Sequence, residues 1–368
     1  MNRSVGKFNS RFVQTLVLCF TVIALSIPLA AQASYRPAQT SDYLFNDSHF
    51  HLTNYVQEGT DIRVFLKIMG NKVGRVALFG IPLQQQWSYR IDGERGPTYY
   101  LQSDAPLYYY SFTDASIATA YKSLTKEEQA RFDPMITGFN PTDMYAADHI
   151  RRVLKTFPGV FTGIGEFSIH KEFVSAKIAG DVASLQDQAL DRLIEFAADA
   201  GLVVVFHCDV DAPFPKAGAS PAYAGQIKSF FRRHPRATII WAHIGVGRIV
   251  RPLTDQAAIV EDIIKDPQLK NVHFDISWDE VAKYVVATPE STTKAAAMVN
   301  RYPDRFLFGT DEVAPANEEN YLRVFNQYQP FWKLLTPEAS EKVRKGNYVR
   351  LFDEARRKVR SWEAAHLK

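Results

Sequence analysis

Residues 44–52 read Leu-Phe-Asn-Asp-Ser-His-Phe-His-Leu, an apolar run that ends in two histidines one residue apart. The run predicts a β-strand, and side chains at i and i+2 of a strand point to the same face of the sheet. His49 and His51 are therefore expected side by side, spaced so that both imidazoles could bind one metal ion. His-x-His alone is a weak motif, so its meaning depends on what the rest of the chain supplies.

Short apolar segments rich in Val, Ile and Phe recur along the chain after this first one. Such segments are typical of strands buried on both faces of a parallel sheet. With residues 44–51 they make eight predicted strands, the others at 75–81, 133–139, 161–167, 202–208, 238–244, 272–277 and 306–311. Amphipathic segments of helical period lie between strands, as at residues 185–197, where Gly201 follows as a helix stop.

Eight alternating β/α units predict an α/β fold, a single-domain (β/α)8 barrel of the TIM type. A doubly wound open sheet is the alternative. No Gly-x-Gly-x-x-Gly follows any predicted strand, which argues against a dinucleotide-binding sheet. A charged C-terminal helix, residues 351–367, is expected to cover the exterior of the barrel.

The connection after the second predicted strand is unusually long. It runs from Ile81 to Asp133 with little regular pattern, and long irregular loops in compact domains are commonly functional. We expect either a lid with aromatic walls over the barrel mouth or a loop packed down by its own aromatic side chains. Those side chains are Trp87, Tyr89, Tyr99, Tyr100 and Tyr108–Tyr110.

The first 33 residues have the pattern of a secretory signal peptide. A basic start without acidic residues precedes an apolar run from Phe12 to Ala30, and Ala31-Gln-Ala33 is a small-x-small cleavage site. The alternative is an uncleaved membrane anchor. We expect cleavage after Ala33, a mature domain over residues 34–368, and a periplasmic or secreted protein.

The mature chain is expected to be near neutral, because the leader carries three of the 43 basic residues and none of the 40 acidic ones. This balance gives no reason to expect nucleic acid or a membrane surface as a partner. The expected partner is a small-molecule substrate, and the sequence leaves a homo-oligomer open. Of the two cysteines, only Cys208 follows the leader, so the mature chain forms no internal disulfide.

Polar residues gather at the carboxyl ends of the predicted strands, where barrel enzymes carry their chemistry. Each alone has an ordinary structural explanation, such as a hydrogen-bonded histidine or a helix cap. Together they are harder to dismiss, because parallel barrel strands converge on one mouth. Besides His49 and His51, the set is Glu166 in Gly163-Ile-Gly-Glu166, His207 in Val203-Val-Val-Phe-His207, His243 in Ala242-His-Ile-Gly245, and Asp311 in Phe308-Gly-Thr-Asp311.

These motifs and Asp47-Ser-His-Phe-His51, in this order and spacing, resemble the amidohydrolase superfamily. The most similar branch is the amidohydrolase-related group, which also contains metal-dependent decarboxylases. The resemblance spans residues 47–352 and implies that His49, His51, His207 and Asp311 bind a metal. It further implies that His243 acts as an acid/base or electrophile, and that Glu166 is a ligand or supports one.

One departure from the superfamily concerns the number of metals. Binuclear members often bridge two ions with a carbamylated lysine on the fourth strand, where this chain has Glu166, and Lys171 lies beyond the strand end. This favours one divalent metal, although a pair bridged by Glu166 stays open. Three imidazoles and a carboxylate suit Zn²⁺ best, with Mn²⁺ or Fe²⁺ as weaker choices.

The expected reaction is hydrolysis of an amide, ester or lactone of a small molecule by a metal-activated water, with Asp311 as proton acceptor. Non-oxidative decarboxylation of a small aromatic or unsaturated acid uses the same ligands and is the alternative; arginines at the mouth would favour it, the candidates being Arg90, Arg95 and Arg248. A binding protein without catalysis is a third hypothesis, weakened by the complete motif set.

The other histidines and Cys208 are interpreted as structural or exposed; these histidines are His149, His170, His234, His273 and His366.

Overall fold

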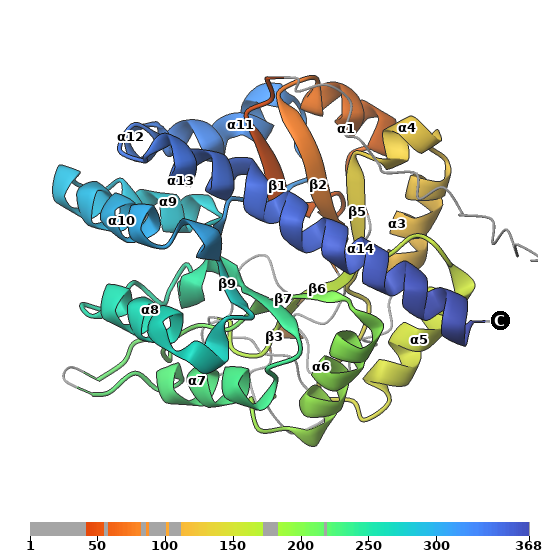
Figure 1. Ribbon diagram of the computed structural model, residues 1–368, viewed down its shortest axis with the longest axis horizontal. Helices are drawn as coiled ribbons and strands as arrows, with labels where there is room; N and C mark the ends of the chain where they lie inside the picture. Colours follow the sequence, from red (N-terminus) through yellow and green to blue (C-terminus); the bar gives the residue numbers. More distant parts are fainter. Residues whose placement is uncertain are drawn as a thin grey trace, which may run out of the picture. The chain divides into compact units, whose positions relative to one another are not determined.

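Parallel strands form one continuous sheet in the computed structural model, which describes residues 42–54, 58–81, 86–87, 101–102, 112–171, 183–216 and 219–367 (Figure 1). The strand order in the sheet is β10-β9-β8-β7-β6-β5-β2-β1-β11. The strands are β1 (Phe45–His51), β2 (Val73–Phe79), β5 (Phe132–Ile136), β6 (Gly163–Ser168), β7 (Val203–His207), β8 (Thr238–Trp241), β9 (Val272–Asp275), β10 (Phe306–Leu307) and β11 (Glu312–Val313).

The two edges of this sheet belong to one stretch of chain. β10 pairs with β9, β11 pairs with β1, and only residues 308–311 separate β10 from β11. Within that stretch the backbone of Phe308 accepts a hydrogen bond from Ser48 at 3.1 Å, and the N–H of Asp311 donates to His49 at 2.7 Å. The eighth predicted strand therefore closes the sheet, and the predicted (β/α)8 barrel is confirmed.

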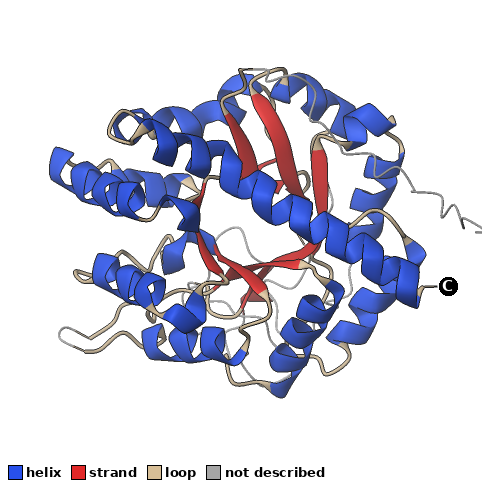
Figure 2. Ribbon diagram, viewed as in Figure 1, coloured by secondary structure: helices blue, strands red, loops and turns tan. Residues whose placement is uncertain are grey.

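Helices surround the strands, as Figure 2 shows. Several begin at the capping residues that favour helix starts: Asp61 caps α1, and Thr288 forms a capping box at α10. Gly201, in the left-handed conformation with φ 78°, ends α6 as predicted. The helices are α1 (Ile62–Met69), α3 (Thr113–Lys122), α4 (Lys126–Gln129), α5 (Ala146–Thr156), α6 (Gln188–Ala200), α7 (Ala224–Arg233), α8 (Gln256–Lys265), α9 (Asp279–Val285), α10 (Pro289–Arg301), α11 (Glu318–Gln327), α12 (Gln329–Trp332), α13 (Pro337–Glu341) and α14 (Asn347–His366).

The connection between β2 and β5 is less irregular than the sequence suggested. Helices α3 and α4 occupy its second half, and Asp114 of α3 accepts backbone hydrogen bonds from Thr137 and Gly138. In its first half, β3 (Gln86–Trp87) pairs in parallel with β4 (Leu101–Gln102). The other aromatic residues of the predicted lid, and all its aromatic side chains, lie outside the described part of the chain, so the lid stays a prediction.

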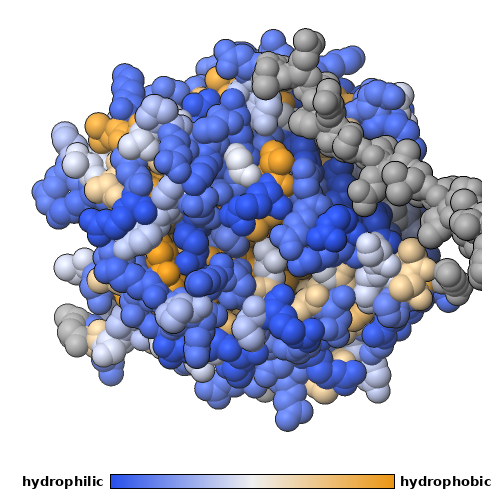
Figure 3. Space-filling view, in the orientation of Figure 1, coloured by the Kyte–Doolittle hydropathy of each residue, from blue (hydrophilic) through white to orange (hydrophobic). Residues whose placement is uncertain are grey.

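Helix α14 closes one end of the barrel instead of covering its outer wall, which corrects the expectation for this segment (Figure 1). Tyr348, Leu351 and Phe352 on its apolar side pack against barrel-interior side chains that include Val203 and Ile240. The face that carries this helix is predominantly hydrophilic (Figure 3). The helix thus seals the barrel with one side and meets solvent with the other.

A buried carboxylate fixes α14 to the amino-terminal end of the strands. Asp133, near the start of β5, is fully buried and is 2.7 Å from both Arg75 of β2 and Arg356 of α14. The hydroxyl of Tyr348 donates to the same carboxylate at 2.8 Å. The opposite, carboxyl-terminal end of the strands is where the predicted site residues lie.

Among the described residues, no helix is long and apolar enough to cross a membrane.

Candidate active site

Every residue that the sequence singled out for the site lies at the carboxyl-terminal end of a barrel strand. His49 and His51 end β1, Glu166 lies in β6, and His207 ends β7. His243 lies in a short 3-10 turn, Ala242–Gly245, directly after β8, and Asp311 precedes β11. The four histidines and Glu166 are buried. The barrel thus brings together six chemical groups that are up to 262 positions apart in the chain.

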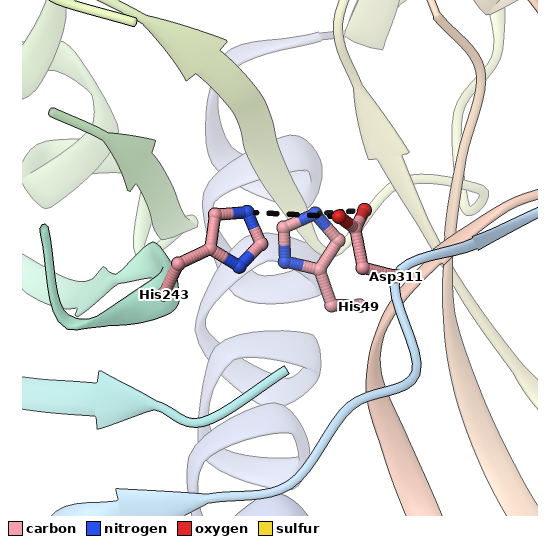
Figure 4. Close-up of side chains that lie close together, drawn as sticks. All are labelled: His49, His243 and Asp311. Atoms are coloured by element: carbon pink, nitrogen blue, oxygen red, sulfur yellow. Dashed lines mark ion pairs between the residues drawn. The ribbon is translucent and has the colours of Figure 1, made fainter. Parts of the chain in front are cut away.

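Asp311 is the carboxylate around which three of the histidines meet. Its Oδ1 is 3.3 Å from His49 Nε2 and 3.2 Å from His51 Nε2, and its Oδ2 is 3.8 Å from His243 Nε2. Figure 4 shows the side chains of His49, His243 and Asp311 pointing toward one another. One ligand atom from each of these three lies within 4.8 Å of the others, a spacing that could hold a metal ion.

Glu166 faces two different pairs of histidines with its two oxygens. Oε2 is 3.7 Å from His49 Nε2 and 3.8 Å from His51 Nε2. Oε1 is 2.8 Å from His207 Nδ1 and 3.4 Å from His243 Nε2. Glu166 therefore belongs to two groups of residues that could each hold a metal ion. One group contains His49 and His51, and the other contains His207 and His243.

The second ring nitrogen of each mouth-facing histidine is held by the protein. His49 Nδ1 is 2.8 Å from Asp275, and His51 Nδ1 is 3.2 Å from the carbonyl of Gly80. Ser277 Oγ lies 3.0 Å from His243 Nδ1 and donates to Asp275 at 2.6 Å. Such contacts fix the ring orientation and leave Nε2 facing the site, the arrangement usual for metal-binding histidines.

His207 differs from the other three because both of its ring nitrogens face carboxylates. Its Nε2 is 3.0 Å from Asp209 Oδ1, while its Nδ1 contacts Glu166. His207 consequently belongs to the group of Glu166 and His243, and not to the one formed by His49, His243 and Asp311. Its predicted role as a ligand alongside His49, His51 and Asp311 stays a prediction.

Burial disfavours the charged form of each group, but neighbours reverse this effect for both carboxylates and for two histidines. Facing carboxylates outweigh burial and raise the pKa of His49 and of His207. Against burial, His49 and His51 hold the pKa of Asp311 well below its usual range. Likewise Lys171, with Nζ 3.6 Å from Oε1, and His207 outweigh burial and lower the pKa of Glu166. Burial prevails for His243, and its pKa is lowered. Ionised carboxylates and a neutral imidazole are the forms that bind a metal.

Two of the site residues have left-handed backbone conformations that non-glycine residues rarely adopt. φ is 55° at His243, 54° at the following Ile244, and 54° at Asp311. Such conformations cost of order 1 kcal/mol or more each and concentrate at functional sites. The chain is therefore held in strained turns at the two places where the loops aim His243 and Asp311 inward.

The sequence interpretation missed the residues that orient the site. Asp275 ends the seventh barrel strand, so the strand-end rule that found Asp311 also applies to it. Asp209 lies two residues after His207, and the i, i+2 rule used for His49 and His51 would have paired them. Ser277 ended the predicted seventh strand, but the structure ends that strand at Asp275. Ser277 and Trp278 lie in the loop after it, where no periodicity indicates which way a side chain points.

The histidines that the sequence analysis interpreted as structural or exposed lie outside the cluster. His170 stacks on Tyr223 with ring centroids 3.8 Å apart, and His234 contacts Asp191 and Glu195 on α6. His273 is buried near the start of β9, and His366 stacks on Trp362. His149 lies in α5. Cys208 is fully buried, and burial raises the pKa of its thiol, as befits a structural thiol.

A closed β/α barrel with a histidine–carboxylate cluster at the carboxyl ends of its strands defines a class of barrel hydrolases and related enzymes. The sequence model of the family described as Amidohydrolase matches residues 47–353. This chain therefore belongs to the amidohydrolase family. No sequence among the curated proteins matches it significantly.

Solved structures with the same fold are similar to this chain at low sequence identity. An uncharacterized TIM-barrel protein from Bordetella bronchiseptica is 14% identical, with a TM-score of 0.52, and the match covers 84% of this chain and 99% of that one. A putative 2-pyrone-4,6-dicarboxylic acid hydrolase from Pseudomonas putida is 12% identical, with a TM-score of 0.50 and coverage of 85% and 98%. A 2,6-dihydroxybenzoate decarboxylase from Rhizobium is 15% identical, with a TM-score of 0.47 and coverage of 84% and 99%. The first two likenesses support the barrel fold.

Proposed function

We propose that this protein is a metal-dependent hydrolase that cleaves an amide, ester or lactone bond of a small molecule. One observation carries the proposal: the Nε2 atoms of His49 and His243 are buried and form no hydrogen bond among the described residues, yet both face the Asp311 carboxylate. Buried polar atoms without a partner are costly. A divalent cation held by His49 and Asp311 would satisfy His49 Nε2 and leave His243 Nε2 facing the water or substrate beside it.

The donor set fits such a cation. His49, His51 and Asp311 would hold it, because Asp311 Oδ1 lies 3.3 and 3.2 Å from the two Nε2 atoms. Glu166 forms a possible metal-binding group with the same two histidines and would be a further oxygen donor. Imidazole and carboxylate ligands suit Zn²⁺ best, and Mn²⁺ or Fe²⁺ less well. When bound, the cation would supply the Lewis acidity that polarises a carbonyl and makes water a nucleophile near neutral pH.

The chain's own residues would then move the protons. Asp311, ionised in this site, accepts a proton from the attacking water. His243 is oriented by Ser277 at Nδ1, so its Nε2 stays directed at Glu166 and Asp311. From that position it can polarise the carbonyl of the substrate or protonate the leaving group.

The contacts of Glu166 also support a second arrangement of the metal site, in which its carboxylate would be shared by two cations. One would be held with His49 and His51 and the other with His207 and His243, because each oxygen faces one of these pairs. The single-cation site is our main proposal. Metal content of the purified protein separates the two: one equivalent per chain for the main proposal, two for the bridged one.

Decarboxylation of a small carboxylic acid is the second candidate function, because it uses the same residues. The observation that favours it is the position of Arg248, which contacts Trp278 next to His243 and so offers a cation for a carboxylate. Arg90 and Arg95, the other two arginines considered, lie outside the described residues.

A substrate screen on metal-depleted and zinc-reloaded protein tests the proposed function. Lactones, amides, esters and aromatic acids are incubated with both forms, and products are identified by NMR. We expect turnover of at least one lactone, amide or ester, abolished by chelation and restored by Zn²⁺. Release of CO₂ from an acid, without hydrolysis of any ester, amide or lactone, would support the decarboxylase instead. Turnover that survives complete metal removal would contradict both.

A further inference from the structure

Asp47, two residues before His49 in β1, is a fully buried carboxylate to which the proposed function gives no role. Its Oδ1 accepts hydrogen bonds from the backbone N–H groups of His49 at 3.0 Å and of Thr310 at 2.9 Å. Its Oδ2 accepts hydrogen bonds from the hydroxyl of Thr310 at 2.7 Å and from that of Tyr321 at 2.9 Å. Four donors of the protein thus converge on this carboxylate, as a buried charge requires.

Two of these donors belong to the turn that positions Asp311. Residues 308–311 lie between β10 and β11, and the N–H of Asp311 donates to the carbonyl of His49 at 2.7 Å. The preceding residue, Thr310, is bound by Asp47 at both its N–H and its hydroxyl. The carboxylate of Asp47 therefore fixes the turn at the residue next to Asp311.

The turn depends on such support because its backbone is both strained and closely packed. φ is 54° at Asp311, a left-handed conformation that persists only where the surrounding structure enforces it. A Cβ added at Gly309 would lie 2.7 Å from the Cβ of His49, so the turn lies directly against β1. A small displacement of Thr310 would therefore change the position of Asp311 relative to His49.

Tyr321 connects this arrangement with helix α11. Its side chain is fully buried and packs against Phe45, Phe50 and Phe65, with ring centroids 6.4, 5.3 and 5.0 Å away. These apolar contacts hold the ring in place, so its hydroxyl is directed at Asp47. The helix thus contributes one fixed donor to the carboxylate from outside the strands.

We propose that Asp47 is a positioning residue that sets the distance between the proposed metal ligands His49 and Asp311. It binds the N–H of His49 and, through Thr310, the backbone next to Asp311, so one carboxylate holds both. Asp47 belongs to none of the groups of described residues that could hold an ion, so it acts through the ligands. The inference rests on the proposed function, since it takes the cluster as a metal site.

Two matched tyrosine variants, together with Asp47→Ala, test the inference. Tyr321→Phe removes one hydroxyl from Asp47. The control Tyr348→Phe removes one from Asp133, the buried carboxylate at the opposite end of the strands. Both tyrosines are at most 1% exposed, and their hydroxyls lie 2.9 and 2.8 Å from the respective carboxylates.

Three measurements are made on each protein. Competition with a chromogenic chelator gives the zinc affinity, and the visible spectrum of the Co²⁺-loaded protein reports the geometry of the ligands. Urea unfolding of the metal-free protein gives its stability.

We expect Tyr321→Phe to weaken zinc binding roughly two- to tenfold, the usual size for one hydrogen bond. Asp47→Ala should weaken it about 10–100-fold and shift the Co²⁺ absorption bands, the effect expected when the support of metal ligands is removed. Tyr348→Phe should lose as much stability as Tyr321→Phe but keep the zinc affinity and Co²⁺ spectrum of the wild type. This combination separates positioning of the ligands from a general loss of stability.

If Asp47→Ala does not fold, the comparison of the two tyrosine variants decides. An unchanged zinc affinity in Tyr321→Phe, or an equal loss in Tyr348→Phe, would overturn the inference. Wild-type protein that binds no zinc would refute the proposed function, and the inference with it. Metal-dependent turnover in a wild type whose zinc affinity Tyr321→Phe leaves unchanged would refute the positioning role alone.

Discussion

Three histidines of the cluster use their two ring nitrogens for different contacts. In His49, His51 and His243, Nδ1 contacts an acceptor or hydroxyl of the protein and Nε2 faces Asp311. A substitution that removes one Nε2 should therefore change the chemistry of the site. It should leave the contacts that orient the other histidines in place. This makes the roles of single residues separable by mutation.

We predict that Asp311→Asn and His243→Asn differ in metal content. Asp311 is proposed both as a ligand and as the proton acceptor, so Asp311→Asn should weaken metal binding and abolish activity. His243 is proposed to work beside the cation, so His243→Asn should keep its metal and lose roughly 10²–10⁴ in kcat, the usual range for a positioned acid/base group. Metal stoichiometry and turnover, measured together on both variants, check this.

His49→Asn is the reference for the loss of a true ligand. If His243→Asn loses its metal as completely as His49→Asn does, His243 is itself a ligand and the proposed division of roles is wrong. The grouping of His243 with His49 and Asp311 within 4.8 Å makes this a demanding test.

At the residue scale, the sequence predicted which groups meet but not what orients them. His49, Glu166, His207 and Asp311 end or nearly end apolar strands, and parallel strands deliver their ends to one mouth. The support of Ser277 for His243 could not be predicted, because it depends on how two loops from different strands approach each other.

Helix α14 shows how one element stabilises the barrel without taking part in its chemistry. It contributes Arg356 and Tyr348 to the buried carboxylate of Asp133 and fills the amino-terminal opening with apolar side chains. The proposed catalytic cluster lies at the other end of the strands. Stability and activity should therefore respond separately to changes at the two ends.

We predict that Asp133→Asn destabilises the fold by about 3 kcal/mol, because removing one partner of a buried ion pair leaves charge uncompensated. Arg75 is the more buried of the two arginines affected, with its side chain 11% exposed. Urea unfolding followed by circular dichroism measures the change. Asp262→Asn, whose carboxylate is 63% exposed and pairs with Lys228, is the matched control and should change stability by less than about 1 kcal/mol.

Metal content of Asp133→Asn should match that of the wild type while the protein is folded. A variant as stable as the wild type would show that α14 is held by its apolar contacts alone and that the Asp133 network contributes nothing.

At the element scale, apolar runs predicted the strands because both faces of a barrel strand are buried. The search for apolar patterns missed helix α3. Its buried residues include Thr113 and Asp114 as well as Ile117 and Ala118. A helix that buries polar groups has no apolar stripe of helical period to recognise. The position of α14 was missed because its sequence shows which side is apolar and not which end of the barrel that side covers.

Acid stability of the whole molecule should depend on His273, a buried histidine near the start of β9. Burial, reinforced by Arg350 and Arg305, lowers its pKa to about 3 from 6.5. The native state thus keeps His273 neutral where the unfolded chain binds a proton. Stability therefore falls as pH decreases from about 6.5, by roughly 1.4 kcal/mol per pH unit.

We predict that His273→Gln reduces this pH dependence. Between pH 7 and pH 5, the wild type should lose about 2 kcal/mol more than the variant, measured by urea unfolding at both values. His366→Gln, which alters an exposed histidine at the end of α14, should follow the wild type. An equal loss in the wild type and His273→Gln would show that His273 is protonated in the native state.

For the whole chain we also propose export with cleavage after Ala33, on the basis of the basic, apolar and small-x-small segments of residues 1–33. These residues lie outside the described part of the structure. N-terminal sequencing of protein from the native compartment should begin at Ser34. Recovery of a chain that still starts at Met1, from the cytoplasm, would contradict the proposal.

Both proposed reactions require a divalent cation bound at the mouth of the barrel. Elemental analysis of wild-type protein and of His49→Asn, both equilibrated with Zn²⁺ and then freed of excess metal, tests it most directly. We expect at least one zinc per chain in the wild type and a loss of that zinc in the variant, with both proteins folded by circular dichroism. Folded wild-type protein that retains no zinc, or a variant that retains all of it, would contradict the claim.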